Sequence, residues 1–272
     1  MYDSHIHSNN SHDSNQSVDE ICRTAIEKGL KSVAICDHAD MCFALELDTY
    51  GQMKKCIREV NEAREKYKGQ LKVFQGIEMA EYYDEEEESK KILALCDYDV
   101  ILGSVHTVIT EDFPDSYSRI DFGEHLPEAK IDSLMKRYFE KMRDMVETTD
   151  FDILTHINCP IRYINGKYGR GYDIMKFKKE MTDIMEMIIS KNIALELNTS
   201  GVNGNLNGLM PSEEIFDLYK KMNGKLITIG SDAHASPNIG KGFDITKEFL
   251  LSKGYKCYHY FEKRKPVEAG LK

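Results

Sequence analysis

The stretch that decides the fold is the first twelve residues, MYDSHIHSNNSH, Met1 to His12. It holds three histidines within eight positions, and the residues around His5 are long enough only for a short strand. His5 and His7 are two residues apart, so on an extended backbone their side chains point to the same side. That arrangement offers one cation two imidazole ligands. A disordered histidine-rich tail is the alternative, and the later sequence argues against it.

A strand-then-helix pattern repeats along the rest of the chain. Ser17 and Glu20 form a capping box that begins a helix, and Gly29 ends it. Short apolar runs typical of buried strands follow at 30–36, 71–77, 99–105, 151–155, 193–197 and 225–229. Helical patterns lie between them, around 53–67, from 84–88 onward, at 129–147, at 173–191, from 211–214 and up to about 254. A short strand is expected near 256–260, and loops at 107–127 and 161–172. A loop as long as the first is usually functional or a lid.

Seven successive β-α units imply a parallel sheet, because each crossover helix returns the chain to start the next strand in the same direction. Unbroken repetition favours a barrel over an open sheet. We find no linker and no break in composition, so residues 1–272 are expected to form a single α/β domain.

Bulk properties exclude several classes of protein. The formal charge is −10, from 46 acidic and 36 basic residues, whereas nucleic-acid surfaces normally carry a basic excess. No stretch of consecutive apolar residues is long enough for a membrane-spanning helix, and no secretory signal is expected. The cysteines are odd in number and none forms a CxxC pair, which suits free, mostly buried thiols in a reducing cytosol. A cytoplasmic location is therefore expected.

Titratable residues gather at the carboxyl ends of the predicted strands, which meet at one face of a β/α barrel. They are His5, His7, His38, Glu78, His106, His156, Asp232 and His234, and the strand at 193–197 adds Asn198. One histidine after a strand is usually a hydrogen-bonded structural residue. Seven of nine histidines in such positions, counting His12, predict a metal site, because imidazole and carboxylate are preferred ligands of divalent transition metals. His125 and His259 fall outside this pattern and are expected to be structural or on the surface.

Six motifs together resemble the PHP (polymerase and histidinol phosphatase) superfamily along nearly the whole chain. They are Asp3-Ser4-His5-Ile6-His7, Asp37-His38, Gly76-Ile77-Glu78, Gly103-Ser104-Val105-His106, Thr155-His156 and Ser231-Asp232-Ala233-His234. Residues 195–201 (LELNTSG) and 260–266 (YFEKRKP) are similar to stretches of its monofunctional histidinol-phosphate phosphatases.

The resemblance implies a distorted (β/α)7 barrel, TIM-barrel-like, that holds three divalent metal ions. Zinc, iron and manganese all suit a histidine-rich set. Carried over by motif, the first ion is held by His5, His7, Glu78 and Asp232; the second by Glu78, His106 and His156; and the third by His12, His38 and His234.

The implied activity is hydrolysis of L-histidinol phosphate to L-histidinol and phosphate, a step of histidine biosynthesis, through a metal-bridging hydroxide. Three divalent cations carry six positive charges, and two carboxylates and one hydroxide cancel three of them. The remaining positive charge of about +3 attracts a phosphate dianion, although the protein as a whole is acidic. An arginine is expected on the phosphate, with Arg162 the first candidate and Arg119 the second. Asn198 is also a candidate for substrate contact. For protonation of the leaving group we consider Asp232 and His234 without preference.

One departure from the resemblance is Val202-Asn203-Gly204-Asn205, where some relatives carry a basic residue. Two other functions stay open. The first is hydrolysis of another small phosphate ester or of a nucleic-acid end, against which the acidity of the chain argues. The second is a degenerate metal-binding domain used for protein contacts, which the intact ligand set disfavours. The oligomeric state is not indicated by the sequence.

Overall fold

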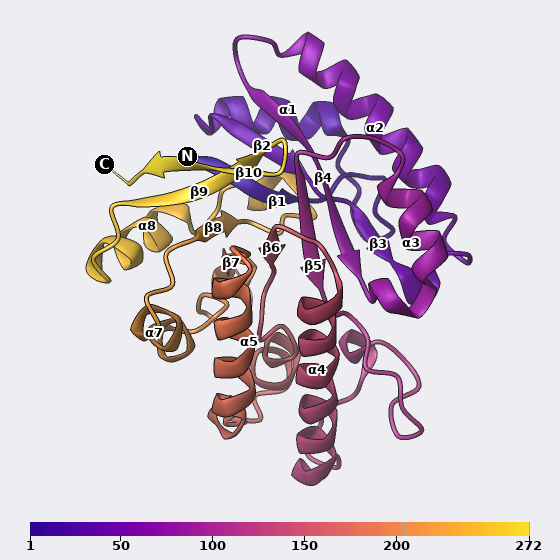
Figure 1. Ribbon diagram of the computed structural model, residues 1–272, viewed down its shortest axis with the longest axis vertical. Coiled ribbons are helices and arrows are strands. Elements are labelled where there is room, and N and C mark those ends of the chain that lie inside the picture. The colour runs from indigo at the N-terminus through magenta and orange to yellow at the C-terminus, as the bar shows by residue number, and fades with distance from the viewer. Residues whose placement is uncertain (204, 272) are drawn as a thin grey trace.

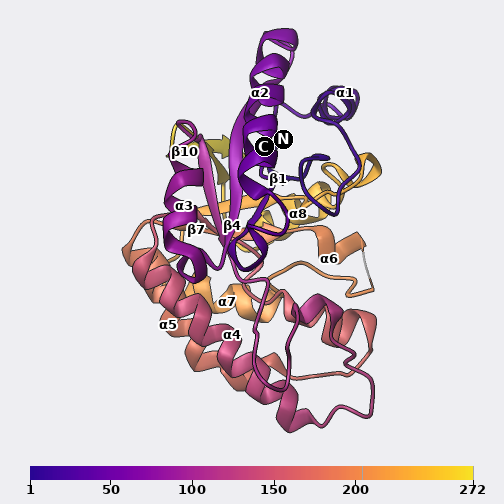
Figure 2. The same cartoon turned by 90° about the vertical axis from the view of Figure 1, so that its right-hand side faces the viewer.

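The computed structural model describes residues 1–203 and 205–271, which form a barrel of parallel strands surrounded by helices (Figures 1 and 2). Hydrogen bonding follows the order β1-β2-β4-β5-β6-β7-β8-β9-β10. The first seven of these strands are parallel: β1 (Tyr2–Ile6), β2 (Ser32–Ile35), β4 (Lys72–Ala80), β5 (Val100–Ser104), β6 (Ile153–Leu154), β7 (Ala194–Asn198) and β8 (Ile227–Gly230).

The two ends of the seven-stranded sheet meet through a single parallel bridge, between Ile6 and Ala233. Around it, the amide of His7 donates to the carbonyl of Ala233 at 3.1 Å, and the amide of Asp232 donates to the carbonyl of His5 at 2.8 Å. Few backbone hydrogen bonds thus close the ring of strands between β1 and β8, and those just given involve residues that follow the end of β8. The predicted distorted (β/α)7 barrel is confirmed.

The helices lie outside the strands, as Figure 2 shows for α2, α3, α4 and α5. Their bounds are α1 (Val18–Glu27), α2 (Thr49–Lys66), α3 (Glu86–Leu93), α4 (Glu128–Thr148), α5 (Lys178–Ser190), α6 (Ser200–Asn203), α7 (Glu213–Lys221) and α8 (Phe243–Ser252). The predicted capping box is present in part, because the hydroxyl of Ser17 accepts the amide of Glu20 at 3.2 Å and begins α1. Met181 and Met185 of α5 are fully buried, as expected for methionines that fill the core.

A C-terminal hairpin lies against the start of β1, at the N-terminal side of the barrel (Figure 1). Its strands are β9 (Cys257–Glu262) and β10 (Lys265–Gly270), and the second was not expected from the sequence. Tyr2 stacks on Tyr260 with ring centroids 4.2 Å apart. The hairpin therefore supports the strand that carries His5 and His7.

Three local features differ from the sequence prediction. β4 continues to Ala80, so Glu78 lies within a strand rather than at its end. His38 begins a short additional strand, β3 (His38–Asp40), which pairs with β4. The predicted loop at 161–172 contains a π-helical turn, Arg162–Lys167. The expected loop at 107–127 is present, with one 3-10 turn at Tyr117–Arg119.

All seven cysteines are free, and four of them are buried. In the described part of the chain, no helix combines the length and the apolar character that a membrane crossing requires.

Candidate metal centre

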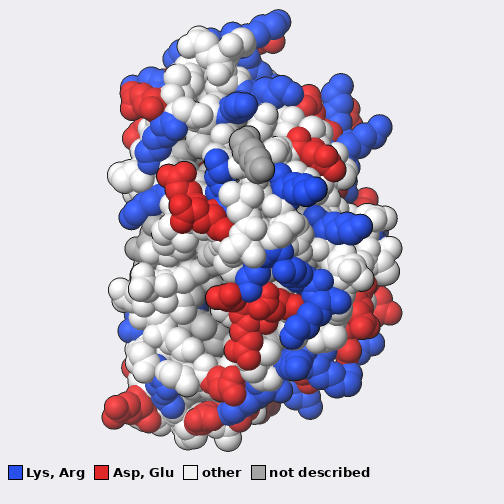
Figure 3. Space-filling model, turned by 90° about the vertical axis from the view of Figure 1, so that its left-hand side faces the viewer, with Lys and Arg blue, Asp and Glu red and all other residues white. Residues whose placement is uncertain are grey.

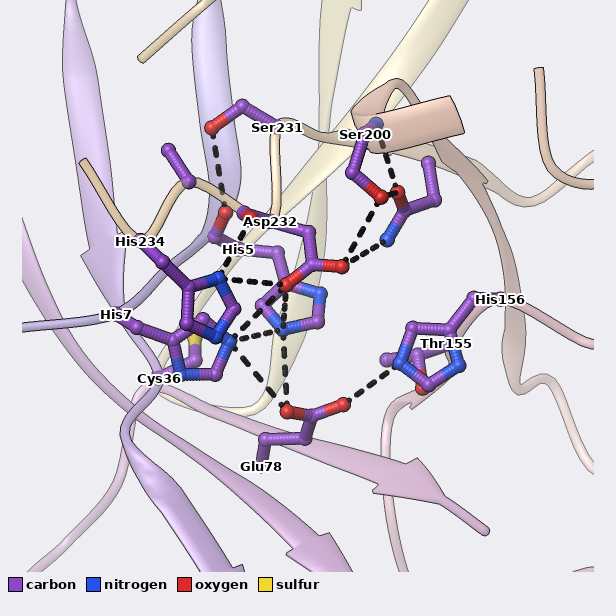
Figure 4. Close-up of polar contacts among 12 residues, drawn as sticks. His5, His7, Cys36, Glu78, Thr155, His156, Ser200, Ser231, Asp232 and His234 are labelled. Carbon is purple, nitrogen blue, oxygen red and sulfur yellow. Dashed lines mark hydrogen bonds and ion pairs between the residues drawn. The ribbon is translucent and has the colours of Figure 1, made fainter. Parts of the chain in front are cut away.

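Histidine and carboxylate side chains from six strands or their following loops meet at one end of the barrel. Figure 4 shows six of them, His5, His7, Glu78, His156, Asp232 and His234. His5 and His7 come from the end of β1, Glu78 from β4, and Asp232 and His234 from the loop after β8. His38, His106 and His156 complete the set from β3 and from the loops after β5 and β6. His5, His7 and Glu78 are fully buried.

Four potential ligand atoms surround one point at this centre (Figure 4). Nε2 of His5 and Nε2 of His7 lie 3.0 Å apart. Oε2 of Glu78 lies 3.4 Å from the first nitrogen and 3.5 Å from the second. Oδ1 of Asp232 lies 3.9 Å and 3.3 Å from the same two atoms. A zinc ion with bonds of about 2.0–2.2 Å separates tetrahedral ligand atoms by about 3.3–3.6 Å, so this spacing fits one ion.

The other oxygen of Glu78 faces a second group of ligands. Oε1 lies 2.9 Å from Nε2 of His156 and 3.3 Å from Nε2 of His106. The two oxygens of one buried carboxylate therefore point to two different sets of histidines. This is the arrangement that a carboxylate bridging two ions requires.

A third group lies at the outer side of the centre, and it differs from the expected set. Nε2 of His38 and Nε2 of His234 are 3.4 Å apart. The carboxylate of Asp13 lies 3.6 Å from the first nitrogen and 3.1 Å from the second. His12, the expected third ligand, is exposed, and its ring centroid lies 5.4 Å from that of His38. Asp13 therefore lies beside this pair as a carboxylate that was not expected, while His12 lines the same cavity next to His38.

Two buried polar atoms of the centre, Oε2 of Glu78 and Nδ1 of His38, make no hydrogen bond of good geometry among the described residues, although they lie 3.0 Å apart. Oε2 also lies 3.4 Å and 3.5 Å from the ring nitrogens of His5 and His7. A carboxylate oxygen surrounded by imidazole nitrogens without well-oriented hydrogen bonds has the surroundings of a metal ligand. The residues present therefore fit divalent transition metals.

The charges of the centre follow from burial and from close neighbours. Burial opposes ionisation of Glu78, but His106, His5 and His38 hold the pKa of its carboxyl well below the usual value. Burial also opposes the charged form of His5, yet Glu196 and Glu78 raise the pKa of its imidazole well above the usual value. These carboxylates therefore favour positive charge beside them, which bound cations supply.

Two carboxylates orient the histidines from behind, and neither was identified as functional from the sequence. Oε1 of Glu196 lies 2.7 Å from Nδ1 of His5, and its Oε2 accepts the amide of His156 at 3.0 Å. Oδ1 of Asp40 lies 2.8 Å from Nδ1 of His106. A carboxylate on the far ring nitrogen fixes the tautomer and orientation of a ligating histidine. In the sequence, the one indication is that Glu196 lies two residues before Asn198 on the same strand, so that both side chains point to the same side.

Two of the predicted ligands have a backbone that L-residues seldom adopt. His156 has φ 20° and Asp232 has φ 50°. Such conformations cost about 1–3 kcal/mol each and concentrate at functional sites, where surrounding contacts hold them. The backbone amides of both residues are hydrogen-bonded within the barrel, to Glu196 and to the carbonyl of His5 respectively.

A cavity of about 390 Å³ opens over this centre. Its lining includes Glu78, His106, His234, Arg162 and Arg119. Nη1 of Arg162 donates to Oγ of Ser200 at 2.9 Å and to Oδ2 of Asp232 at 3.3 Å. Arg119 reaches the cavity from the long loop, but 67% of its side chain is exposed and it pairs with Asp115.

Asn198 lies outside the cavity, contrary to the expected substrate contact. It is fully buried, and its Nδ2 donates to Glu196 at 3.0 Å and to Asp232 at 3.3 Å. Its Oδ1 accepts the hydroxyl and the amide of Ser200. Because every polar atom of the side chain is used within the protein, Asn198 positions other residues and does not reach a substrate.

Comparison with known proteins gives one family and several relatives. The sequence pattern of the PHP domain family matches residues 3–200. A protein of Clostridium acetobutylicum named "Probable histidinol-phosphatase" is 26% identical, over 97% of this chain and 98% of its own length. The histidinol-phosphatase of Lactococcus lactis is also 26% identical, over 85% of this chain and 83% of its own.

Among solved structures, the histidinol phosphate phosphatase of Lactococcus lactis in complex with zinc, L-histidinol and phosphate has a similar fold. Its TM-score is 0.79 at 20% sequence identity, and the match covers 98% of each chain. At this identity the likeness establishes the barrel fold of the chain.

Proposed function

This chain belongs to the PHP domain family, and we propose that it is a metal-dependent phosphomonoesterase that hydrolyses L-histidinol phosphate to L-histidinol and phosphate. One observation carries the proposal: both oxygens of Glu78 face histidines, and the group lies beneath a cavity that also holds Arg162. The names of the Clostridium and Lactococcus relatives support the substrate, as do the ligands of the Lactococcus structure. A histidinol-phosphatase acts in histidine biosynthesis.

We propose three divalent ions, each held by one of the three groups of ligands. His5, His7, Glu78 and Asp232 form the first group, Glu78, His106 and His156 the second, and His38, His234 and Asp13 the third. Zinc, iron and manganese all suit these nitrogen and oxygen ligands. When bound, close divalent ions activate water as a nucleophile and stabilise the attacking and leaving oxygens of an in-line displacement.

The side chains of the protein position the phosphate. Catalysis of phosphoryl transfer depends mainly on positioning and on stabilising charge, because the transition state is loose. Arg162 supplies a guanidinium at the cavity wall, and Ser200, Asp232 and Tyr163 hold it in place through hydrogen bonds. A planar guanidinium suits two phosphate oxygens at once.

Neither of the two candidates for protonating the leaving group is favoured by its surroundings. Burial opposes the ionised form of Asp232, but His7, His5, His234 and Arg162 hold the pKa of its carboxyl well below the usual value. Asp232 therefore carries no proton to donate near pH 7. His234 lines the cavity, but its Nε2 faces the third group of ligands and its Nδ1 lies 3.0 Å from the carbonyl oxygen of Asp232.

The free cysteines and the biosynthetic activity lead us to propose a single cytoplasmic domain acting on a small molecule rather than on nucleic acid. On the face shown in Figure 3, acidic and basic side chains lie interspersed. That pattern suits a solvated surface more than a polyanion-binding one.

Phosphate release from a panel of esters tests this proposal. L-Histidinol phosphate, p-nitrophenyl phosphate and a 5′-phosphorylated oligonucleotide are compared, with metal analysis of the same sample and Glu78→Gln as the inactive control. We expect hydrolysis of L-histidinol phosphate to be much faster than that of the other two. Equal rates would mean that the protein is a phosphatase of broad specificity. Faster hydrolysis of the oligonucleotide would mean that its substrate is a nucleic-acid end.

A further inference from the structure

A second cluster of metal-binding side chains lies on the C-terminal hairpin. Sγ of Cys257, a ring nitrogen of His259 and a carboxylate oxygen of Glu268 all lie within 4.8 Å of one another. Cys257 and His259 are half-buried, and Glu268 is exposed. Because His259 pairs with Thr228 near the start of β8, the cluster is separate from the centre, which lies beyond the other end of that strand.

Strand pairing places the three side chains on one face. Cys257 and His259 are two residues apart in β9, so they point to the same side. His259 pairs directly with Glu268 of the antiparallel strand β10, which puts both on that face. Cys257 pairs with Gly270, which has no side chain, so the space opposite the thiol is open toward its diagonal neighbour Glu268.

His259 has one ring nitrogen without a partner. Its Nδ1 is buried and lacks a hydrogen-bond partner within the described part of the chain. The neutral imidazole is the form that binds metals. A buried imidazole nitrogen without a partner costs free energy unless something outside the protein pairs with it.

We propose that Cys257, His259 and Glu268 form a second transition-metal site, which takes one zinc-class divalent ion and leaves a coordination position open for water. Zinc binds cysteine sulfur at about 2.3 Å and nitrogen or oxygen at about 2.0–2.2 Å, which separates tetrahedral ligand atoms by about 3.3–3.6 Å. The ligand atoms need to approach by no more than about 1.5 Å, which side-chain rotation of Cys257, His259 and Glu268 would supply.

Binding at this site releases a proton. A cysteine binds metal ions as the thiolate, whereas a free thiol carries its proton near pH 7. A coordinating ion displaces the thiol proton to solvent and forms the metal–sulfur bond with the resulting thiolate. No oxidant or reductant is involved, and the affinity rises with pH.

The ion would join β9 to β10 across the hairpin. This hairpin contacts β1 through the stacked rings of Tyr2 and Tyr260 and through Tyr258, whose hydroxyl accepts the amide of Tyr2 at 2.9 Å. An ion at the hairpin therefore restrains the segment that supports His5 and His7. The site is structural in this role and stands independently of the phosphatase assignment.

Cobalt titration of the full-length protein tests this site, because a cysteine thiolate on Co²⁺ gives a sulfur-to-metal charge-transfer band. The proposed ligand atoms at the barrel centre are nitrogen and oxygen, so they give no such band, and Cys159, the cysteine that lines the cavity over that centre, is tested separately. We expect the wild type to show the band with one equivalent of cobalt beyond the barrel centre. Cys257→Ser should abolish the band, and Glu268→Gln should weaken cobalt binding at least about 10-fold. Cys96→Ser, a half-buried cysteine elsewhere, should keep the band.

Circular dichroism of each variant checks that it is folded, and His259→Gln provides a second ligand deletion if Cys257→Ser is unstable. The proposal fails if the wild type shows no charge-transfer band. It also fails if the band persists in both ligand deletions, or if it disappears in Cys159→Ser, which would place the thiolate at the barrel centre.

Discussion

His5 and Glu196 form a close pair in the interior of the barrel, with Nδ1 of the imidazole 2.7 Å from Oε1 of the carboxylate. Both side chains are buried. The pair leaves Nε2 of His5 directed at Glu78 and His7, 3.4 Å and 3.0 Å away. Glu196 thus determines which ring nitrogen of His5 faces the metal centre.

Replacing Glu196 by Gln should weaken metal binding without removing a ligand. The amide keeps the size of the side chain but loses the charge that orients His5 and raises ligand basicity. Loss of such a partner typically costs 10–100-fold in metal affinity. Isothermal titration with zinc measures it, and Glu140→Gln on the exposed face of α4 is the matched control. Unchanged affinity in Glu196→Gln would mean that the carboxylate has only a packing role.

Replacing Glu78 by Gln should abolish phosphatase activity and lower the metal content by two ions per chain, because its oxygens face two groups of histidines. Elemental analysis after gel filtration gives the content, with Glu140→Gln again as control. Loss of a single ion would show that Glu78 does not bridge, and full retention would remove it from the ligand set.

Replacing Arg162 by Ala should raise KM while the metal content stays unchanged. A hydrogen bond to a charged group is worth about 1.5–3 kcal/mol, which corresponds to about 10–150-fold in binding. Arg119→Ala is the comparison, and its smaller expected effect follows from its exposure and its pairing with Asp115. Equal effects of the two substitutions would contradict the assignment of Arg162 as the main phosphate contact.

The third group of ligands allows a test between two neighbouring residues. Asp13→Asn should release one ion, because its carboxylate lies 3.1 Å from Nε2 of His234. His12→Gln should leave the metal content unchanged, because the His12 ring approaches only His38, with centroids 5.4 Å apart, and makes no hydrogen bond or ion pair with this group among the described residues. Metal analysis of both variants distinguishes them, and the reverse result would restore His12 as the ligand.

The barrel and most of its convergent residues are predictable from the sequence because strand direction alone carries the ends of parallel strands to one face. His5, His7, His106, His156, Asp232 and His234 follow from that rule. Glu196 does not, because a glutamate within an apolar strand carries no sign of the histidine it will meet. The choice between His12 and Asp13 depends on the path of a loop, which neighbouring residues do not encode.

The second strand of the C-terminal hairpin also escapes prediction, for a local reason. Its turn is Lys263-Arg264, and both residues have positive φ, 53° and 60°. Such two-residue turns usually carry Asn-Gly or Asp-Gly, so the usual signal is missing. The cluster that includes His259 was not predicted either, since its partner Glu268 lies on the second strand of the hairpin.

The single bridge between Ile6 and Ala233 has a consequence for biosynthesis of the protein. The first ion's ligands come from both chain segments that the bridge joins. His5 and His7 lie in the segment of Ile6, and Asp232 lies in the segment of Ala233, more than two hundred residues later in the chain. A chain emerging from the ribosome therefore exposes its first histidines long before their partner exists. Ring closure joins residues far apart in sequence, which is slow compared with local folding. Metal loading should accordingly follow translation, and a truncated product would hold loosely any ion it acquires.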